Sequence, residues 1–368
     1  MKKMDRFLVL MAVLSTCLLS ACAGKVQPPP LKVYWPPPPA ESKMEWITTF
    51  SSADNFPKTE REVSVEKFLG KKDYDRFKKP VSVATDSKGL VYVADMDAGL
   101  IQVIDFDARK MSPYTEGGMG MPLDIAFDSQ DNLYLAEGIG KQILVYSPNR
   151  QPLRSIGSGE LGKPSYIALN EKLGRLYVTD VINHVVVVFD LNSGKKLFSF
   201  GGIGVGKGEM HGPQGIAIDK ENRVFVAEQF NARIQVFDAD GKHQFMFGSR
   251  GDDPFQFEGP RGLAFDSEGN LFVAEARKAS ILLFKPDGTP LTSLGARGVS
   301  THQLGFTLPS SVFIDDNDRI YISDGMNKRI TIWQMLTPKY LAKHPLDREA
   351  LQEIEKKVLR IRQEGKTQ

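Results

Sequence analysis

The chain has 368 residues, of which 41% are hydrophobic, so it is long and apolar enough to bury a large core. Its 47 basic and 45 acidic residues give a formal net charge of +2, and residues 1–21 account for that excess. The rest of the chain is neutral. This gives no support for nucleic-acid binding, because such proteins normally present a basic face.

Residues 1–21 have the pattern of a secretory signal peptide. Lys2, Lys3 and Arg6 precede an apolar run, residues 7–19, that is shorter than the roughly 20 residues a membrane-spanning helix requires. The following Leu19-Ser20-Ala21-Cys22 resembles the lipobox of bacterial lipoproteins. The resemblance implies cleavage before Cys22, a diacylglycerol group on its thiol and a firm membrane anchor. An ordinary signal peptide with a chance cysteine is the alternative.

Two further features of this region bear on localisation. Ala23 and Gly24 stand where Asp favours inner-membrane retention in Gram-negative lipoproteins, so the resemblance implies the outer membrane. Residues 22–43 are predicted to be a tether, because the proline runs within residues 26–40 favour extended polyproline II. A docking segment that uses Tyr34 and Trp35 is the alternative.

From residue 80 onward, one unit recurs six times. Each unit begins with a proline and a short apolar run that ends in Asp or Asn, and a second, alternating run ends in an acid. The first runs are Pro80–Asp86, Pro122–Asp128, Pro164–Asn170, Pro213–Asp219, Pro260–Asp266 and Pro309–Asp315. The acids that end the second runs are Asp95, Glu137, Asp180, Glu228, Glu275 and Asp324.

Each acid is followed by a third apolar run, and most units close with a fourth run that ends in glycine. Periods of about 40–50 residues that hold several short strands are typical of β-propeller blades. We predict an all-β, six-bladed propeller over residues 44–336, with the first strand of each unit nearest the axis because it carries small residues.

The whole-repeat signature over residues 80–336 resembles NHL repeats, with the best copies at residues 213–248 and 260–295. The resemblance implies the fold and says little about function. The sixth unit stops after its third strand, so we expect residues 45–50 to supply the missing strand and remove an open sheet edge. Residues 64–70 compete for that place, but the capping box at residues 59–62 favours a helix over residues 60–69.

Residues 337–368 are predicted to leave the propeller and to form a helix over residues 346–363. Leu351, Ile354, Val358 and Ile361 would form one apolar stripe of that helix. The stripe would either pack against the side of the propeller or bind a partner.

The six repeated acids could form a carboxylate ring for Ca²⁺. We favour a structural role, because an acid in every blade is more easily a repeat element than a catalyst. Asn or Arg residues that follow several of the acids could fasten the adjoining turn. The five histidines have no metal-ligand spacing.

The predicted contact residues lie on the face that carries the turns between second and third strands and the linkers between blades. They are Tyr166, His211, Gln214, Phe230, Arg261, Arg277 and Met326. The linker residues Met210, Phe255, Phe257 and Phe306 are instead expected to pack between blades.

We therefore predict a membrane-anchored envelope lipoprotein whose propeller binds another envelope protein, without a cofactor or catalysis of its own. The chain, including its WPPPP segment, is similar throughout to deltaproteobacterial proteins that are associated with multihaem-cytochrome electron transfer, which implies an assembly or docking role there. The alternative is a Ca²⁺-dependent lactonase or hydrolase with its site in the channel, as in six-bladed lactonases of similar fold.

Overall fold

The computed structural model describes residues 32–70, 75–295 and 305–364. The signal peptide, Cys22 and the first part of the proline-rich segment lie outside these residues, so the lipid anchor stays a prediction. The fold below concerns the chain from Tyr34 onward.

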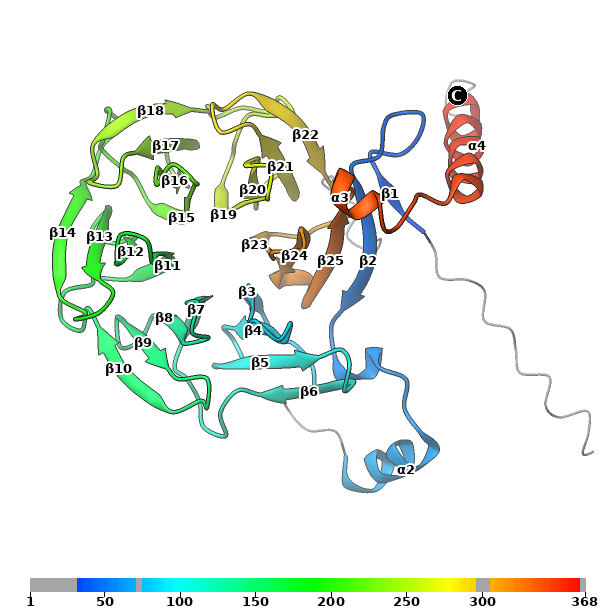
Figure 1. Ribbon diagram of the computed structural model, residues 1–368, viewed down its shortest axis with the longest axis horizontal. Coiled ribbons are helices and arrows are strands. Elements are labelled where there is room, and N and C mark those ends of the chain that lie inside the picture. Colours follow the sequence, from blue (N-terminus) through cyan, green and yellow to red (C-terminus); the bar gives the residue numbers. More distant parts are fainter. Residues whose placement is uncertain (1–31, 71–74, 296–304, 365–368) are drawn as a thin grey trace, which may run out of the picture. The chain divides into compact units, whose positions relative to one another are not determined.

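Six antiparallel sheets surround one axis as the blades of a six-bladed β-propeller (Figure 1). The strand that begins with the repeat's proline is innermost in every blade, and the inner strands neighbour one another around the ring, as the repeats predict.

Blade 1 contains β3 (Pro80–Thr85), β4 (Val91–Asp95), β5 (Leu100–Asp105) and β6 (Lys110–Pro113); blade 2 contains β7 (Pro122–Phe127), β8 (Leu133–Glu137), β9 (Gln142–Tyr146) and β10 (Pro152–Ile156); blade 3 contains β11 (Pro164–Asn170), β12 (Arg175–Asp180), β13 (Val185–Asp190) and β14 (Lys196–Gly201). Blade 4 contains β15 (Pro213–Ile218), β16 (Val224–Glu228), β17 (Arg233–Phe237) and β18 (His243–Phe247); blade 5 contains β19 (Pro260–Phe265), β20 (Leu271–Glu275), β21 (Ser280–Phe284) and β22 (Pro290–Leu294); blade 6 contains β23 (Pro309–Ile314), β24 (Arg319–Asp324) and β25 (Arg329–Met335) from the repeat.

Blade 6 is closed by the amino-terminal strand β2 (Met44–Phe50), which confirms the preference for residues 45–50. β2 pairs antiparallel with β25, from Met44 opposite Met335 to Phe50 opposite Ile330. The competing segment forms helix α2 (Glu60–Leu69), with Thr59 as its N-cap and a capping box to Glu62. Closure therefore joins the segment that precedes the repeats and the last repeat in one sheet.

The proline-rich segment differs from the extended tether expected over residues 22–43. Its residues Tyr34–Trp35 form strand β1, which adds to the outer edge of β2 and makes blade 6 five-stranded. Tyr34 is buried, and the Trp35 indole donates a hydrogen bond of 2.5 Å to the Ser293 carbonyl of blade 5. At least the end of the segment is thus part of the folded body, because its aromatic residues find partners on two blades.

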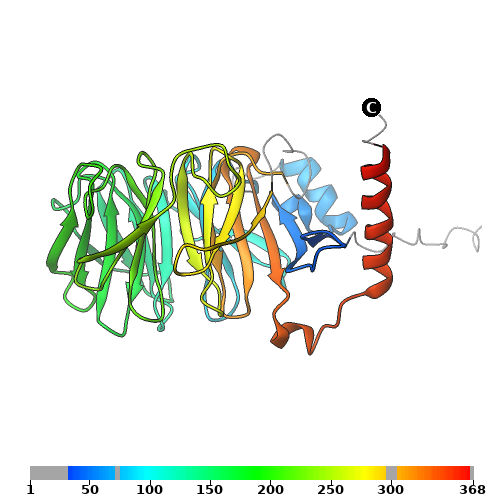
Figure 2. The ribbon, with the colours of Figure 1, turned by 90° about the horizontal axis from the view of Figure 1, so that it is seen from above.

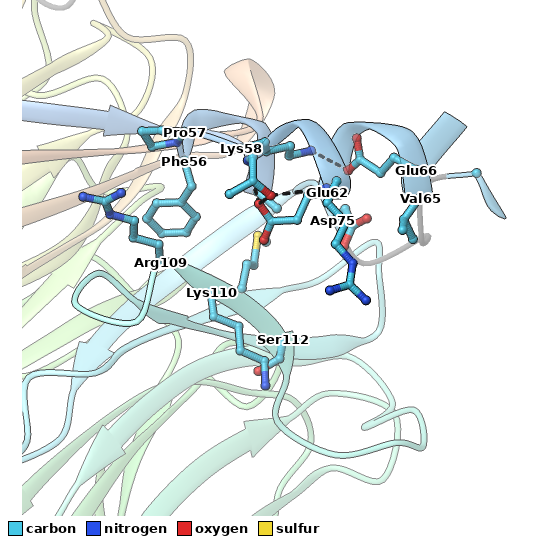
Figure 3. Close-up of a pocket in the computed structure, with 15 residues that line it drawn as sticks. Phe56, Pro57, Lys58, Glu62, Val65, Glu66, Asp75, Arg109, Lys110 and Ser112 are labelled. Atoms are coloured by element: carbon cyan, nitrogen blue, oxygen red, sulfur yellow. Dashed lines mark hydrogen bonds and ion pairs between the residues drawn. The ribbon is translucent and has the colours of Figure 1, made fainter. Parts of the chain in front are cut away.

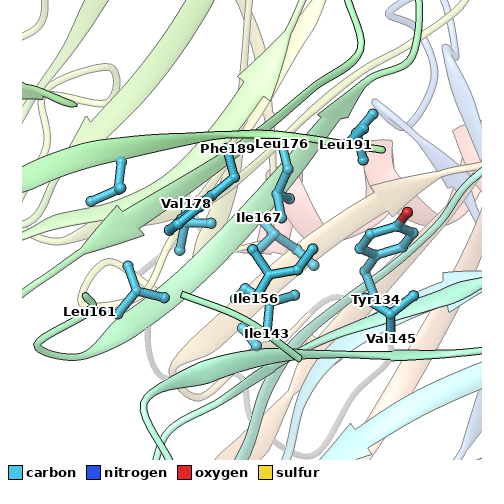
Figure 4. Packing of buried hydrophobic residues seen from close by; sticks show 12 residues of the cluster. Tyr134, Ile143, Val145, Ile156, Leu161, Ile167, Leu176, Val178, Phe189 and Leu191 are labelled. Atoms are coloured by element: carbon cyan, nitrogen blue, oxygen red, sulfur yellow. The ribbon is translucent and has the colours of Figure 1, made fainter. Parts of the chain in front are cut away.

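The hydrophobic core lies between neighbouring blades. Seen at right angles to the axis, the strands run from one face of the ring to the other (Figure 2). Alternate side chains of each strand therefore point to the preceding or the following blade. Figure 4 shows one such layer, in which Val145 and Ile156 of blade 2 meet Leu176 and Phe189 of blade 3. The linker residues Met210 and Phe257 are buried in equivalent layers, as expected, and Phe255 packs half-buried against the layer that holds Phe257. Phe306 is also buried.

The inner strands approach one another closely near the axis. A Cβ atom added to Gly215 would lie 1.9 Å from the carbonyl oxygen of Arg261, and one added to Gly262 would lie 2.7 Å from the Cα of Ser311. Larger residues cannot fit there without moving backbone, so the small residues of the repeat are a packing requirement.

The carboxyl-terminal region contains helices α3 (Pro338–Leu341) and α4 (Arg348–Glu364), and short 3-10 turns occur at Ala53–Asn55 and Gly325–Asn327. In α4, Leu351 and Ile354 of the predicted stripe are half-buried, while the side chains of Val358 and Ile361 lie outside the described part. None of the helices in the described ranges is long and apolar enough to cross a membrane.

Candidate functional site

The candidate site is the face on which the inner strands begin, which we call the loop face. Each inner-strand proline pairs with the acid that ends the second strand, as Pro80 does with Asp95 and Pro213 with Glu228. The turns between second and third strands and the linkers that enter each blade therefore meet on this face.

The six repeated acids are buried and join these loops to the linkers. Each accepts a hydrogen bond from a backbone N–H of the linker that enters its own blade; in blade 1, Lys78 and Lys79 both donate to Asp95 at 2.7 Å. The corresponding donors in the other blades are Met121, Gly162 with Lys163, His211, Glu258 with Gly259, and Thr307. The predicted structural role of the acids agrees with these contacts.

The same carboxylates also hold the turn that follows. In blade 2, Glu137 accepts the backbone N–H groups of Ile139 and Gly140 at 2.8 and 2.5 Å. In blade 4, Glu228 accepts from Asn231 and Arg233, each at 2.5 Å, and from Gln235 at 2.8 Å. Burial raises the pKa of the Asp95, Glu275 and Asp324 carboxyl groups, although the donors around each oppose that rise.

All six turns share one backbone feature, because the residue four positions after the acid has a positive φ in every blade. These residues are Gly99, Lys141, His184, Ala232, Ala279 and Lys328, with φ between 53° and 66°. The shared conformation, fixed by the acid, places the residue two positions after the acid at the tip of each turn.

The turn tips form a ring of exposed side chains, most of them apolar. Ile139, Ile182, Phe230 and Met326 are 68, 60, 48 and 56% exposed, and Asp97 and Arg277 complete the ring. We call these four apolar residues the apolar tip ring. Isolated exposed apolar residues are ordinary, but these four share one repeated position on one face, which makes the loop face the candidate surface.

Aromatic contacts fix part of this surface at blades 3 and 4. The His211 ring lies 5.3 Å from the His184 ring and 4.9 Å from the Phe230 ring, measured between centroids. His184 Nδ1 accepts the Gly212 N–H at 3.1 Å. These contacts position the Phe230 ring on the loop face.

The structure brings only some of the predicted contact residues to this surface. Phe230, Arg277 and Met326 are exposed at turn tips, and His211 is half-buried beside Phe230. Gln214 is half-buried and bonded to Ser165 and Gln229. Sequence reasoning missed Ile139 and Ile182, although their offset from the repeated acid equals that of Phe230.

The structure does not place Tyr166 at the channel mouth, where the sequence predicts a contact residue. It is 9% exposed and lies inside the channel, where its hydroxyl donates a 2.6 Å hydrogen bond to the Ser310 carbonyl. Tyr166 belongs to blade 3 and Ser310 to blade 6, which face each other across the ring. Arg261 is half-buried, and its Nε has no hydrogen-bond partner among the described residues. Tyr166 thus forms a bar across the channel rather than a surface for a protein.

The side chains that line the channel do not provide the oxygen ligands that the calcium alternative requires. Ca²⁺ takes six to eight oxygen ligands, typically several carboxylates. Among the described residues that line the channel cavity, Asp124 supplies the one carboxylate. No group of three or more His, Cys, Asp or Glu side chains suited to a metal occurs in the residues that the structure describes. We therefore derive no reaction step through calcium.

A separate groove of about 890 Å³ lies at the rim, between α2 and the outer strand β6 of blade 1 (Figure 3). Lys58 lies on its wall and pairs with Asp54 at 2.5 Å and with Glu66. Charges of both signs line the groove, including Arg109 and Glu62. Because the charges are mixed, the groove favours no one class of ligand. We attribute it to the way the segment that precedes blade 1 packs against that blade.

Comparisons with known proteins support the fold. A model of the DUF5128 family, described as a 6-bladed β-propeller, matches residues 152–246. Protein lin-41 of Caenorhabditis elegans is 47% identical over 45 residues, which are 12% of this chain and 4% of that protein. The chain therefore matches a small part of that relative's length.

Solved structures show the same architecture at low sequence identity. A protein of unknown function from Bacteroides thetaiotaomicron is 17% identical, with a TM-score of 0.58 over 78% of this chain and 75% of that one. A catalytically inactive histidine-to-alanine variant of virginiamycin B lyase from Staphylococcus aureus, solved with quinupristin, is 16% identical, with a TM-score of 0.53 over 73% of this chain and 83% of that one. At these identities the likeness concerns the fold alone.

Proposed function

We propose that this protein is a binding scaffold of the cell envelope, anchored to the outer membrane through lipid on Cys22, whose loop face binds another envelope protein. The observation that carries the proposal is the apolar tip ring, in which Ile139, Ile182, Phe230 and Met326 are exposed at equivalent turns. The lipobox and the proline-rich segment support the localisation.

The form of the ring favours a protein partner over a small molecule. The four side chains stand at turn tips spread over four blades, so a ligand that contacts all of them must be broad. A typical protein interface covers about 800 Å² on each partner, with an apolar centre and a polar rim. Asp97 and Arg277, at the two remaining tips, would supply polar contacts at such a rim.

The repeated acids make the surface rigid. Because each carboxylate holds both its linker and its turn, the tip residues keep their positions without a partner. A preorganised surface loses less conformational freedom on binding and gains affinity for that reason.

The test replaces Ile139, Ile182, Phe230 and Met326 by Asp in the full-length protein, expressed in its native host. Membrane proteins that co-purify with wild type and variant are compared by quantitative mass spectrometry. We expect one protein to be enriched with wild type and reduced at least tenfold with the variant, a loss of about 1.4 kcal/mol or more.

A matched control carries Leu153→Asp, Leu197→Asp and Leu291→Asp. These residues are 56, 48 and 42% exposed on the outer strands β10, β14 and β22, so the control adds comparable charge away from the loop face. It should retain the partner. Equal recovery of every protein with wild type and the tip variant would exclude the loop face as the binding surface.

A further inference from the structure

The channel of the propeller contains a cavity that the proposed protein interface does not use. It has a volume of about 280 Å³ and is lined by residues of the inner strands. Tyr166 lies at one end of it, and Phe127, Phe265 and Ile314, which end their inner strands, lie at the other. The inner strands begin at the loop face, so the cavity extends from the Tyr166 bar toward the opposite face.

Most of the cavity wall is apolar. One layer consists of the residues three positions after the repeat prolines, which are Val83, Ile125, Ile167, Ile216, Leu263 and Val312. The half-buried residues at the open end, Leu169 among them, are also apolar. A cavity of this kind favours the hydrocarbon part of a small ligand.

A single carboxylate, that of Asp124, lies at the end of the cavity where Tyr166 crosses the channel. Asp124 is 6% exposed, and its two oxygens accept hydrogen bonds from the Ser82 hydroxyl at 2.6 Å and the Ile167 N–H at 2.9 Å. The backbone N–H of Ile125 also faces this carboxylate. A carboxylate has about four acceptor positions, so these donors leave it capacity for one more. No ion pair joins it to a cationic side chain in the described part of the chain.

Asp124 breaks the sixfold pattern of the channel. The equivalent positions, two residues after the other repeat prolines, hold Ser82, Tyr166, Gly215, Gly262 and Ser311. The acids repeated in every blade bind loops, whereas this acid occurs in one blade and contacts two neighbouring inner strands. Desolvation by burial raises its pKa to about 7, so the charged form lacks compensation in this environment.

We infer that the channel cavity binds a small organic amine, with its hydrocarbon part against the aliphatic layer and its ammonium group on Asp124. A protonated amine supplies both the missing donor and the missing positive charge, and a charge-assisted hydrogen bond in a dry site is stronger than a neutral one. The volume accommodates a ligand of fragment size and excludes a peptide. The site is independent of the apolar tip ring, because the Tyr166 bar separates the two.

The test measures binding to the purified full-length protein in detergent at pH 8 by isothermal titration calorimetry. Hexylamine is the probe, and hexanol is its neutral counterpart. We expect hexylamine to bind at one site at least about tenfold more tightly than hexanol. In Asp124→Asn, which preserves the shape of the side chain, the preference for the amine should disappear.

A second variant keeps the result interpretable if Asp124→Asn folds poorly. Leu169→Trp narrows the open end of the cavity and leaves Asp124 in place, and it should weaken both probes together. Equal binding of the two probes to wild type, an unchanged preference in Asp124→Asn, or no saturable binding of hexylamine up to about 10 mM would overturn the inference.

Discussion

The repeated acids of the loop face and Asp124 of the channel are all buried carboxylates, but their surroundings differ. Glu228 accepts a linker N–H and side-chain donors from Asn231, Arg233 and Gln235. Asp124 faces only neutral donors, which are the Ser82 hydroxyl and the backbone N–H groups of Ile167 and Ile125. A carboxylate surrounded by donors from its own blade is a structural element, whereas one with spare acceptor positions beside a cavity can serve a ligand.

The largest effect on the free energy of unfolding should come from replacing a repeated acid. Glu228→Ala would leave the buried Arg233 guanidinium without its carboxylate and several linker and turn donors without an acceptor. Removal of one partner of a buried pair costs about 3–5 kcal/mol. Equilibrium urea unfolding measures this loss, and Glu228→Gln, which keeps an acceptor oxygen, should lose less. A cost below about 1 kcal/mol would show that the acid is not structural.

Asp124 should show the opposite behaviour, because its ionisation weakens the fold. Its folded-state pKa of about 7 lies above the ordinary value of 3.8, so the folded protein binds the proton more tightly than the unfolded chain. Between about pH 4 and 7 this group should therefore lower the free energy of unfolding by about 1.4 kcal/mol per pH unit, and further rise in pH should add nothing.

The measurement compares the free energy of unfolding of wild type and Asp124→Asn across that range. Ser82 and Tyr166, which lie near the carboxyl group, are present in both proteins, and burial keeps the pKa of Tyr166 well above the range. The difference should grow in favour of the variant as the pH rises to 7 and then level off. A difference that does not change with pH would contradict the account.

A smaller effect is expected from Tyr166→Phe. The change removes the hydrogen bond to the Ser310 carbonyl and keeps the ring that crosses the channel. The expected loss is about 1–2 kcal/mol in urea unfolding, because a buried carbonyl is left unsatisfied. Partner recovery through the loop face should be unchanged. A loss of the partner together with normal stability would show that Tyr166 takes part in that interface.

The repeat pattern was sufficient to predict the propeller, the inner position of the first strands, the closing strand over residues 45–50 and the helix over residues 60–69. Each of these depends on spacing within the chain or on local capping at Thr59. The Tyr166 bar and the Asp124 cavity could not be predicted in that way, because they depend on which blades face or adjoin each other across the ring. The pairing of Tyr34 with the edge of β2 was missed because the prolines around it favour an extended tether.

The candidate surface was predicted in part. The turns that the acids define predict Phe230, Arg277 and Met326, whereas the mouth position predicted for Tyr166 is one that it does not occupy. Ile139 and Ile182 could have been found by applying the same offset to every blade. The exposure that makes them a ring depends on the turn conformation, which the sequence alone does not show.

The most direct test of the central claim is site-specific photo-crosslinking in the native host. A photoreactive amino acid replaces Ile139, Ile182, Phe230 or Met326, one at a time. In matched controls it replaces Leu153, Leu197 or Leu291 on the outer strands, at the rim of the propeller. The account predicts that the four tip positions crosslink to the same envelope protein and that the rim positions do not. Crosslinks to that protein from the rim alone, or no crosslink from any tip position, would contradict the proposal that the loop face is the binding surface.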